Sequence, residues 1–283
     1  MIRKQSLRLL LLALSLSASG CAVFNPDSMK EPVAQAAGEE TKKDDKDGMK
    51  PYNKVITKDA KSDAGLFTVH KVKDKYYYEI PDSLFNREML TVTRIAKTAT
   101  GIGFGGGKEN TQVHRWQRKG DKVLLRVVSH EIYAADSLPI HEAVVNSNFE
   151  PIIQSFDIKT EKKDSTGTAA VIDVTDLYTK DVQALGLQDN TRKRYKVSRL
   201  DDSRSYIDTI RSYPENIEIR HVKTYNAGEP PSNESTGSIS MEFSNSMILL
   251  PKVPMQRRYY DQRVGWFTTG QTDYGLDEQK SKN

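Results

Sequence analysis

The sequence of 283 residues lacks several features that would identify a function directly. Cys21 is its only cysteine, which excludes an internal disulfide bond and a cysteine-rich metal site. It contains no G-x-S-x-G turn, the usual sequence sign of a nucleophilic serine. The apolar run Leu9–Leu16 is about half as long as a membrane-spanning helix requires. These absences disfavour a disulfide scaffold, a familiar serine hydrolase and a transmembrane anchor.

Two His-Glu pairs come closest to the HExxH motif, in which two histidines one helical turn apart bind zinc and the glutamate polarises a water molecule. Ala134 stands where a motif starting at His130 requires its second histidine, and Val145 stands there for His141. The remaining histidines lie in strand-like runs and are His70, His114 and His221. We therefore expect no catalytic residue, no metal ligand and no cofactor in this chain. A zinc site made by three histidines that meet in space is the alternative.

The charge balance excludes nucleic acid as an expected partner. The formal net charge is +4, from 42 basic and 38 acidic residues. Three of the cations, Arg3, Lys4 and Arg8, precede the apolar run of the first 20 residues, and without them 39 basic residues face 38 acidic ones. A net charge so close to zero gives no electrostatic reason for binding phosphate backbones.

The first 20 residues have the order of a secretory signal, with cations first, then apolar residues, then small residues. Cys21 follows Ala18-Ser19-Gly20, and this arrangement resembles the lipobox of bacterial lipoproteins, although Ala18 stands where leucine is usual. The resemblance implies cleavage before Cys21 and attachment of lipid to its thiol, so we expect an exported protein held at the cell envelope, in the outer membrane. A plain signal peptide with an incidental cysteine is the alternative.

Residues 21–51 are predicted to be a disordered tether, because mixed charge is dense and hydrophobic residues are few. From Tyr52 onward, short runs with alternating or β-branched apolar residues predict strands. These predicted strands cover residues 66–72, 75–80, 89–95, 108–118, 122–133, 151–159, 169–175, 216–224 and 238–243. Short helical segments are expected at 139–148, 176–187 and 201–213.

Gly101–Gly107 matches the G-x-G-x-x-G pattern of dinucleotide sites, but a strand-like run follows it instead of a helix. We therefore interpret this segment as the tip of a hairpin. The whole pattern predicts a mainly β (α+β) protein, with antiparallel sheets packed as a sandwich or open barrel and a few short helices. We expect a small amino-terminal β domain at 52–98 and a larger β-rich domain at 99–283.

The most distinctive stretch is Met247–Tyr274, in which two prolines end a strand and a cluster of cationic and aromatic residues follows. The candidate site residues in this cluster are Arg257, Arg258, Asp261, Arg263, Gly265 and Trp266. Guanidinium groups pair with carboxylates and stack on rings, so the cluster could bind another protein domain or an extended peptide. Two structural alternatives remain, namely an internal Arg-Asp bridge capped by Trp266 and aromatic residues that simply belong to the core.

Four segments carry a resemblance to a known family. They resemble the amino-terminal region of large bacterial zinc-dependent metalloproteases, and they are residues 60–95, IHEAVVNSNFEPIIQSFDI (140–158), AVIDVTDLY (170–178) and LLPKVPMQRRYYDQRVGWFTTGQTDY (249–274). In that family the region carries domains of unknown function and precedes the HExxH helix. The resemblance implies a non-catalytic accessory region, inactive alone, that docks to or assists a protease domain, with zinc bound only in a complete family member. The alternative is an independent lipoprotein that binds a peptide, a glycan or a protein.

Overall fold

The computed structural model describes residues 49–165, 167–231, 236–256, 258, 261–263, 265 and 269–276. The predicted signal peptide, Cys21 and nearly all of the predicted tether lie outside these residues, as do Arg257 and Trp266 of the predicted cluster. No helix in this described part of the chain is both long and apolar enough to cross a membrane.

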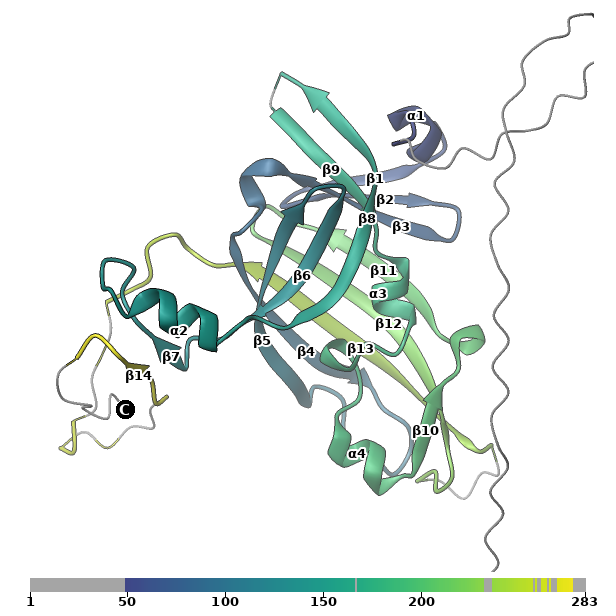
Figure 1. The fold of residues 1–283 in the computed structure, drawn as a ribbon. Helices are drawn as coiled ribbons and strands as arrows, with labels where there is room; N and C mark the ends of the chain where they lie inside the picture. The colour runs from purple at the N-terminus through teal and green to yellow at the C-terminus, as the bar shows by residue number, and fades with distance from the viewer. Residues whose placement is uncertain are drawn as a thin grey trace, which may run out of the picture. The chain divides into compact units, whose positions relative to one another are not determined.

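Antiparallel strands dominate the described chain (Figure 1). The strands are β1 (Lys61–Ala64), β2 (Thr68–Val72), β3 (Lys75–Pro81), β4 (Glu88–Lys97), β5 (Lys108–Lys119), β6 (Lys122–Val128), β7 (Ile132–Tyr133), β8 (Ile152–Asp164), β9 (Gly167–Asp173), β10 (Val197–Leu200), β11 (Tyr206–Ser212), β12 (Asn216–Ala227), β13 (Ser238–Leu249) and β14 (Thr272–Asp273). The α-helices are α1 (Tyr52–Val55), α2 (His141–Ser147), α3 (Thr175–Thr179) and α4 (Asp189–Arg194), and the 3₁₀ helices are η1 (Asp82–Leu84), η2 (Gln183–Leu185) and η3 (Asp202–Arg204).

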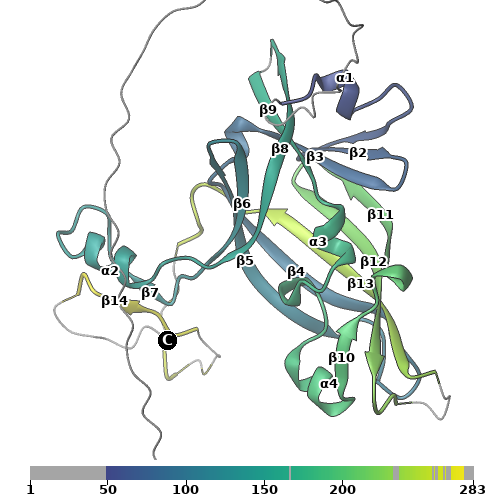
Figure 2. The ribbon, with the colours of Figure 1, turned by 45° about the vertical axis from the view of Figure 1, so that its right-hand side comes forward.

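Twelve of these strands form one strongly curved sheet in the order β1-β2-β3-β9-β8-β6-β5-β4-β13-β12-β10, with β11 also paired to β12. The long strand β8 joins the two halves, since its first residues pair with β6 and its last residues with β9. The ends of the sheet approach each other where the Leu66 N–H donates to the Tyr213 carbonyl at 2.7 Å. The result is a nearly closed barrel (Figure 2), which confirms the predicted mainly antiparallel fold and its open-barrel form.

Alternating side chains fill the barrel. Trp116 on β5 is fully buried, and its ring lies against Phe67, Tyr78 and Phe156. Helix α3 lies against the concave face of the sheet (Figure 2). The hydroxyl groups of its Tyr178 and of Tyr78 on β3 share a hydrogen bond of 2.8 Å. These large rings come from several strands and from α3, and their burial inside the curved sheet stabilises the barrel.

The connection between β4 and β5 contains the glycine-rich segment, so its interpretation as a hairpin tip is confirmed. Gly101, Gly103 and Gly106 all have positive φ, a backbone region that other residues seldom adopt. A boundary between two domains was expected near residue 98. Strand β4, which precedes it, pairs with β5 and β13, which follow it, so the strands on both sides belong to one sheet.

The helix predicted at 201–213 is wrong. This stretch forms the short η3 and then strand β11, which pairs with β12. Ile210 and Ser212 are buried while Arg211 and Tyr213 are exposed, which is the period of a strand. Tyr206 is exposed and Ile210 is buried, although a spacing of four residues returns to the same face of a regular strand. The pairing register shifts between Ile207 and Thr209, and such a bulge places the two side chains on different faces.

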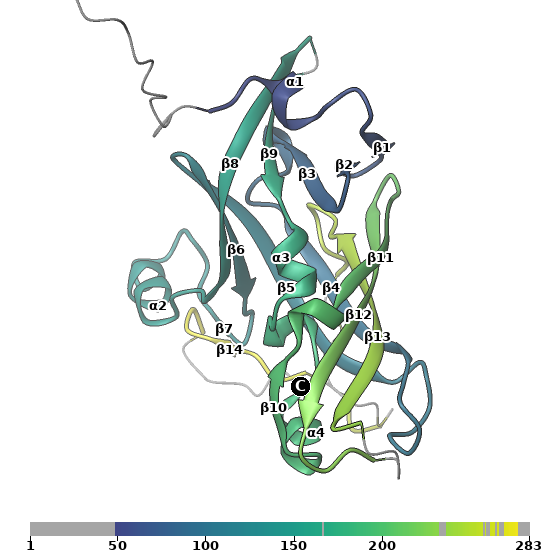
Figure 3. The same ribbon diagram turned by 90° about the vertical axis from the view of Figure 1, so that its right-hand side faces the viewer.

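The strand predicted at 122–133 is divided. Strand β6 ends at Val128, after which the chain leaves the barrel and forms β7, the helix α2 and the return to β8. Figures 1 and 3 show α2 and β7 beside the barrel, next to β14. We call residues 129–150 the α2 lobe.

Candidate functional site

The α2 lobe is held to the end of the described chain by a short parallel pair of strands. Thr272 pairs with Ile132 and Asp273 with Tyr133. The Thr272 N–H donates to the Glu131 carbonyl at 2.7 Å, and the side-chain amide of Gln271 donates to the His130 carbonyl. Residues 251–276, which we call the C-terminal segment, therefore run from the end of β13 to this lobe.

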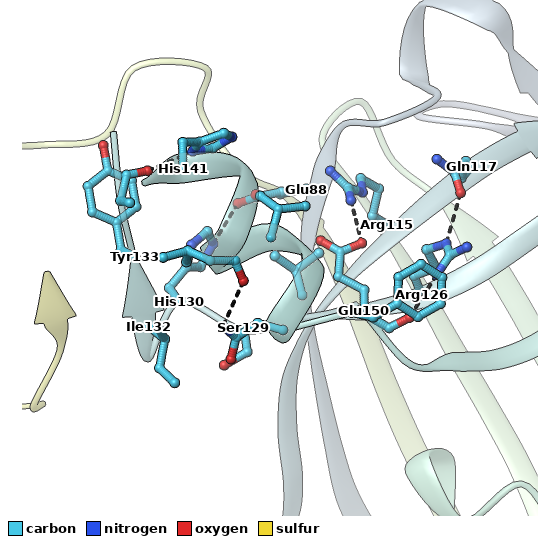
Figure 4. Close-up of a pocket in the computed structure, with 16 residues that line it drawn as sticks. Glu88, Arg115, Gln117, Arg126, Ser129, His130, Ile132, Tyr133, His141 and Glu150 are labelled. Carbon is cyan, nitrogen blue, oxygen red and sulfur yellow. Dashed lines mark hydrogen bonds and ion pairs between the residues drawn. The ribbon is translucent and has the colours of Figure 1, made fainter. Parts of the chain in front are cut away.

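A pocket of about 460 Å³ lies between the α2 lobe and the neighbouring ends of β5 and β6 (Figure 4). Its lining residues are Glu88, Arg115, Gln117, Arg126, Val128, Ser129, His130, Ile132, Tyr133, Ala134, His141, Val144, Val145, Asn148, Phe149 and Glu150. This volume falls within the range of sites that bind small molecules. We call it the α2 pocket.

One wall of the α2 pocket is charged. Arg115 forms an ion pair with the Glu150 carboxylate. Arg126 donates from Nε to the Gln117 side-chain oxygen at 2.8 Å and from a terminal nitrogen to the Glu150 backbone carbonyl at 2.7 Å. The Arg126 guanidinium also lies 4.9 Å from the centre of the Phe149 ring, within the range of a cation–π contact. Figure 4 shows Glu150 next to both guanidinium groups.

The opposite wall carries two histidines. The His130 Nε2 atom lies 3.0 Å from a Glu88 carboxylate oxygen. His141 donates from Nδ1 to the Ala134 carbonyl at 2.9 Å. The histidines of the two His-Glu pairs noted in the sequence thus line one pocket, whereas Glu131 and Glu142 are not among its lining residues. His130 and His141 also do not share a helix face, because only His141 belongs to α2.

The other three histidines are buried at separate positions of the barrel. Burial lowers the pKa of His114 to about 4. Burial and then the charge of Lys223 lower the pKa of His221 to about 3, and its ring stacks on Phe243. Within the residues that the structure describes, no three His, Cys, Asp or Glu side chains are grouped as metal ligands.

His70 belongs to a network that the sequence did not reveal. The Ser62 hydroxyl lies 2.7 Å from His70 Nδ1, and His70 Nε2 lies 3.1 Å from a carboxylate oxygen of Glu79. Glu79 also accepts hydrogen bonds from Tyr52 and Lys162. Burial alone would raise the pKa of Glu79, but the bonds from His70, Tyr52 and Lys162 outweigh it and lower the pKa to about 2. The carboxylate is therefore ionised.

The predicted cluster in the C-terminal segment lies on the surface. Arg263 pairs with Asp261 at 2.6 Å, but the two residues are neighbours in one turn, and the Arg263 side chain is 88% exposed. Arg258 is exposed, and Gly265 has a φ of 68°, a backbone region that favours glycine. The described members thus do not form a bridge between two strands. Arg257 and Trp266 lie outside the described residues.

Sequence reasoning singled out His130 and His141 but missed the charged wall of the α2 pocket. One sequence signal for this wall was present. Arg126 interrupts the apolar run of β6 (KVLLRVV), and a continuous apolar run predicts a strand that is buried on both faces, so its cation is expected to be buried as well. No sequence signal linked Arg126 to Glu150, since their meeting depends on how the chain returns from the lobe.

Comparisons with known proteins identify the family. The model of a domain of unknown function (DUF5118) matches residues 49–98, and the model of a second domain of unknown function (DUF5117) matches residues 106–283. Among curated proteins and among solved structures, no match was found. Domains of unknown function were expected from the sequence, and the second match covers more than half of the chain. The chain therefore belongs to the family defined by the domain of unknown function DUF5117, and carries DUF5118 before it.

Proposed function

We propose that this protein is the non-catalytic accessory region of a membrane-anchored zinc-dependent metalloprotease, and that it binds the protease domain through its C-terminal segment. The observation that carries the proposal is the exposure of the described side chains of this segment, whose sequence also resembles the protease family. Zinc belongs to the protease domain and lipid to Cys21, which tethers the protein at the outer membrane.

The C-terminal segment presents apolar and cationic side chains to solvent. Val253 is 82% exposed and Met255 is 75% exposed, while Arg258 and Arg263 lie on the same surface segment. Methionine, arginine and aromatic residues are enriched in the buried centres of protein interfaces. Exposed apolar side chains so close together support a docking surface more than an internal bridge.

The segment is fixed at both ends. The Arg87 guanidinium donates to the Leu250 carbonyl at 2.7 Å where the segment begins, and the β7–β14 pair holds it where it ends. A surface held in this way loses less conformational entropy on binding than a free chain would. These two attachments support its use as an interface.

Docking is tested with the double variant Val253→Asp/Met255→Asp and with Arg263→Ala. The binding partner is an HExxH-containing domain encoded in the same or the adjoining reading frame. Because these side chains are exposed, we expect unchanged thermal stability and association weakened by about tenfold or more, measured by titration calorimetry. Arg220→Ala, on the outer face of β12, is the control and should bind normally. Lower stability with unchanged association would contradict docking, and the absence of such a reading frame would favour an independent binding lipoprotein.

Lipid attachment is tested separately. Labelled palmitate should enter the wild-type protein in cells and should be absent from Cys21→Ser, because the thiol is the expected acceptor. Label that persists in Cys21→Ser would contradict the lipoprotein assignment and leave the docking proposal standing.

A second candidate function is serine-dependent hydrolysis, favoured by the Ser62–His70–Glu79 contacts. When His70 donates from Nε2 to Glu79, its Nδ1 accepts a hydrogen bond from the exposed Ser62 hydroxyl. Hydrolases use the same order of a nucleophile, a base and an orienting carboxylate, which here would be Ser62, His70 and Glu79. We place it second because Tyr52 and Lys162 share the same carboxylate and thereby fasten α1 to the sheet. A fluorophosphonate probe decides the question. Labelling that disappears in Ser62→Ala would support hydrolysis, and an unlabelled wild-type protein would exclude it.

A further inference from the structure

The α2 pocket contains a buried cation that has no anionic partner. Arg126 is only 7% exposed, and its two hydrogen bonds go to neutral oxygen atoms, the Gln117 side chain and the Glu150 backbone. Among the described residues, no carboxylate lies within ion-pair distance of its guanidinium. Buried charges in proteins are usually paired, because removal from water costs several kcal/mol per ion. Arg126 therefore lacks the partner that its burial calls for.

The nearest carboxylate is already in use. Glu150 forms its ion pair with Arg115, which comes from the adjacent strand β5. The Nε atom of Arg115 is buried and has no hydrogen-bond partner among the described residues. Arg115, Arg126 and Glu150 together leave one positive charge at this wall, and the other carboxylate of the lining, Glu88, lies against His130 on the opposite wall (Figure 4). A second carboxylate at this wall would pair the charge of Arg126.

The rest of the α2 pocket is suited to an apolar body. Val128 and Val144 are nearly buried in its lining, while Val145 and Phe149 are exposed at its edge, Phe149 to 74%. A volume of about 460 Å³ accommodates a small ligand or the last residues of a peptide. The site thus combines an unpaired guanidinium with apolar walls.

We propose that the α2 pocket binds a carboxylate carried on an apolar body, with Arg126 as the group that recognises the carboxylate. Guanidinium groups bind carboxylates through paired, charge-assisted hydrogen bonds. The apolar body lies against Val128, Val144 and Phe149. The carboxylate could belong to the free C-terminus of an apolar peptide or to a medium-chain carboxylic acid, and both present the same chemistry. This inference does not depend on the docking of a protease domain.

The test measures binding by titration calorimetry with four probes. They are the tetrapeptide Ala-Val-Leu-Phe with a free C-terminus, the same peptide as its C-terminal amide, octanoate and octanol. We expect at least one of the two acids to bind, and its neutral counterpart to bind about tenfold or more weakly, because a charge-assisted hydrogen bond is lost. Binding of the peptide acid alone identifies a peptide terminus as the source, and binding of octanoate alone identifies a small acid.

Two variants assign binding to the pocket. Arg126→Gln should weaken binding of the acid about tenfold or more, whereas Arg220→Gln, outside the pocket, should leave it unchanged. Since Arg126 also holds Gln117 and Glu150, Arg126→Gln could fail to fold. Val145→Trp is then decisive, because Val145 is half exposed on α2 and the indole ring would occupy the pocket without disturbing the core. Failure of both acids to bind, equal binding of acid and neutral probe, or unchanged binding in Val145→Trp would overturn the proposal.

Discussion

The barrel buries its large side chains, whereas the α2 lobe and the C-terminal segment leave many of theirs in solvent. Phe67, Tyr78 and Trp116 are fully buried in the barrel, while Phe149 and Val145 of the lobe are exposed. Strands β12 and β13 are joined over eleven residue pairs and β7 and β14 over two. Regions with few buried contacts open at low free energy and commonly carry binding sites. We therefore expect the barrel to supply most of the stability of the protein, and we propose the lobe as the region of recognition.

The largest expected effect comes from Trp116→Ala in the barrel. Its indole packs against Phe67, Tyr78 and Phe156, so truncation leaves a cavity in the core. We expect a loss of about 3–5 kcal/mol in the free energy of unfolding, measured by urea denaturation. Phe149→Ala in the lobe is the matched aromatic control and should change that free energy by less than about 0.5 kcal/mol. Similar losses in both variants would abolish the distinction between the two regions.

Acid should weaken the barrel through its buried histidines. Burial lowers the pKa of His114 to about 4, so the folded state keeps the imidazole neutral while the unfolded state takes up a proton below its ordinary value of 6.5. The stability from this residue is complete above pH 6.5 and is lost as the pH falls from 6.5 toward 4, by about 3 kcal/mol in total. His114→Leu should therefore flatten the dependence of unfolding free energy on pH.

Urea denaturation at several pH values between about 4 and 8 measures this dependence. A slope that persists unchanged in His114→Leu would contradict the role given to His114.

The buried Lys223 should make the free energy of unfolding depend on pH in the alkaline range. Burial lowers its pKa to about 7 from 10.5, so between these values the unfolded state binds a proton that the folded state has released. Stability should therefore rise with pH from about 7 toward 10.5, and below pH 7 the full cost of burying the charge applies. Lys223→Met should stabilise the protein at neutral pH by about 1–4 kcal/mol and remove most of this rise. Urea denaturation near neutral pH and at about pH 9.5 measures both effects, and a destabilised Lys223→Met with an unchanged slope would contradict them.

The smallest global effect is expected at the link between lobe and C-terminal segment. Thr272→Pro removes the N–H that bonds to the Glu131 carbonyl at 2.7 Å. We expect faster hydrogen exchange at Tyr274, whose N–H bonds to the Tyr133 carbonyl, and a change in global stability below about 0.5 kcal/mol. Thr269→Pro, just before the strand, is the control. A cooperative loss of stability in Thr272→Pro would show that the lobe folds as one unit with the barrel.

Much of the barrel could be predicted from local pattern. The strands around Val69, Tyr78, Val92 and Trp116 were found because side chains alternate across a sheet, and the hairpin tips were found because glycine and short polar turns separate these runs. The segment 201–213 was mistaken for a helix because a four-residue spacing is common to both readings. The segment forms strand β11 because it pairs with β12, and this pairing cannot be read from the local sequence.

The candidate sites were predicted less well than the fold. Ser62, His70 and Glu79 come from three strands, and Arg115, Arg126 and Glu150 come from two strands and the loop that precedes a third. No local pattern relates such positions, because their distances depend on strand register and on the path of the connecting chain. Only the cluster near Arg263 was visible in advance, since its members are adjacent in sequence.

The sequence by itself determined the β-rich composition of the protein, the order of most strands, the short helix α2 and the candidate docking residues of the C-terminal segment. Tertiary structure alone decided that the sheet curls into a nearly closed barrel, that β6 ends where the lobe departs, and that Arg126 is buried beside a pocket without an anion. The physical reason is that side-chain periodicity is fixed within a few residues, whereas closure and the pairing of buried charges depend on groups brought together from distant parts of the chain.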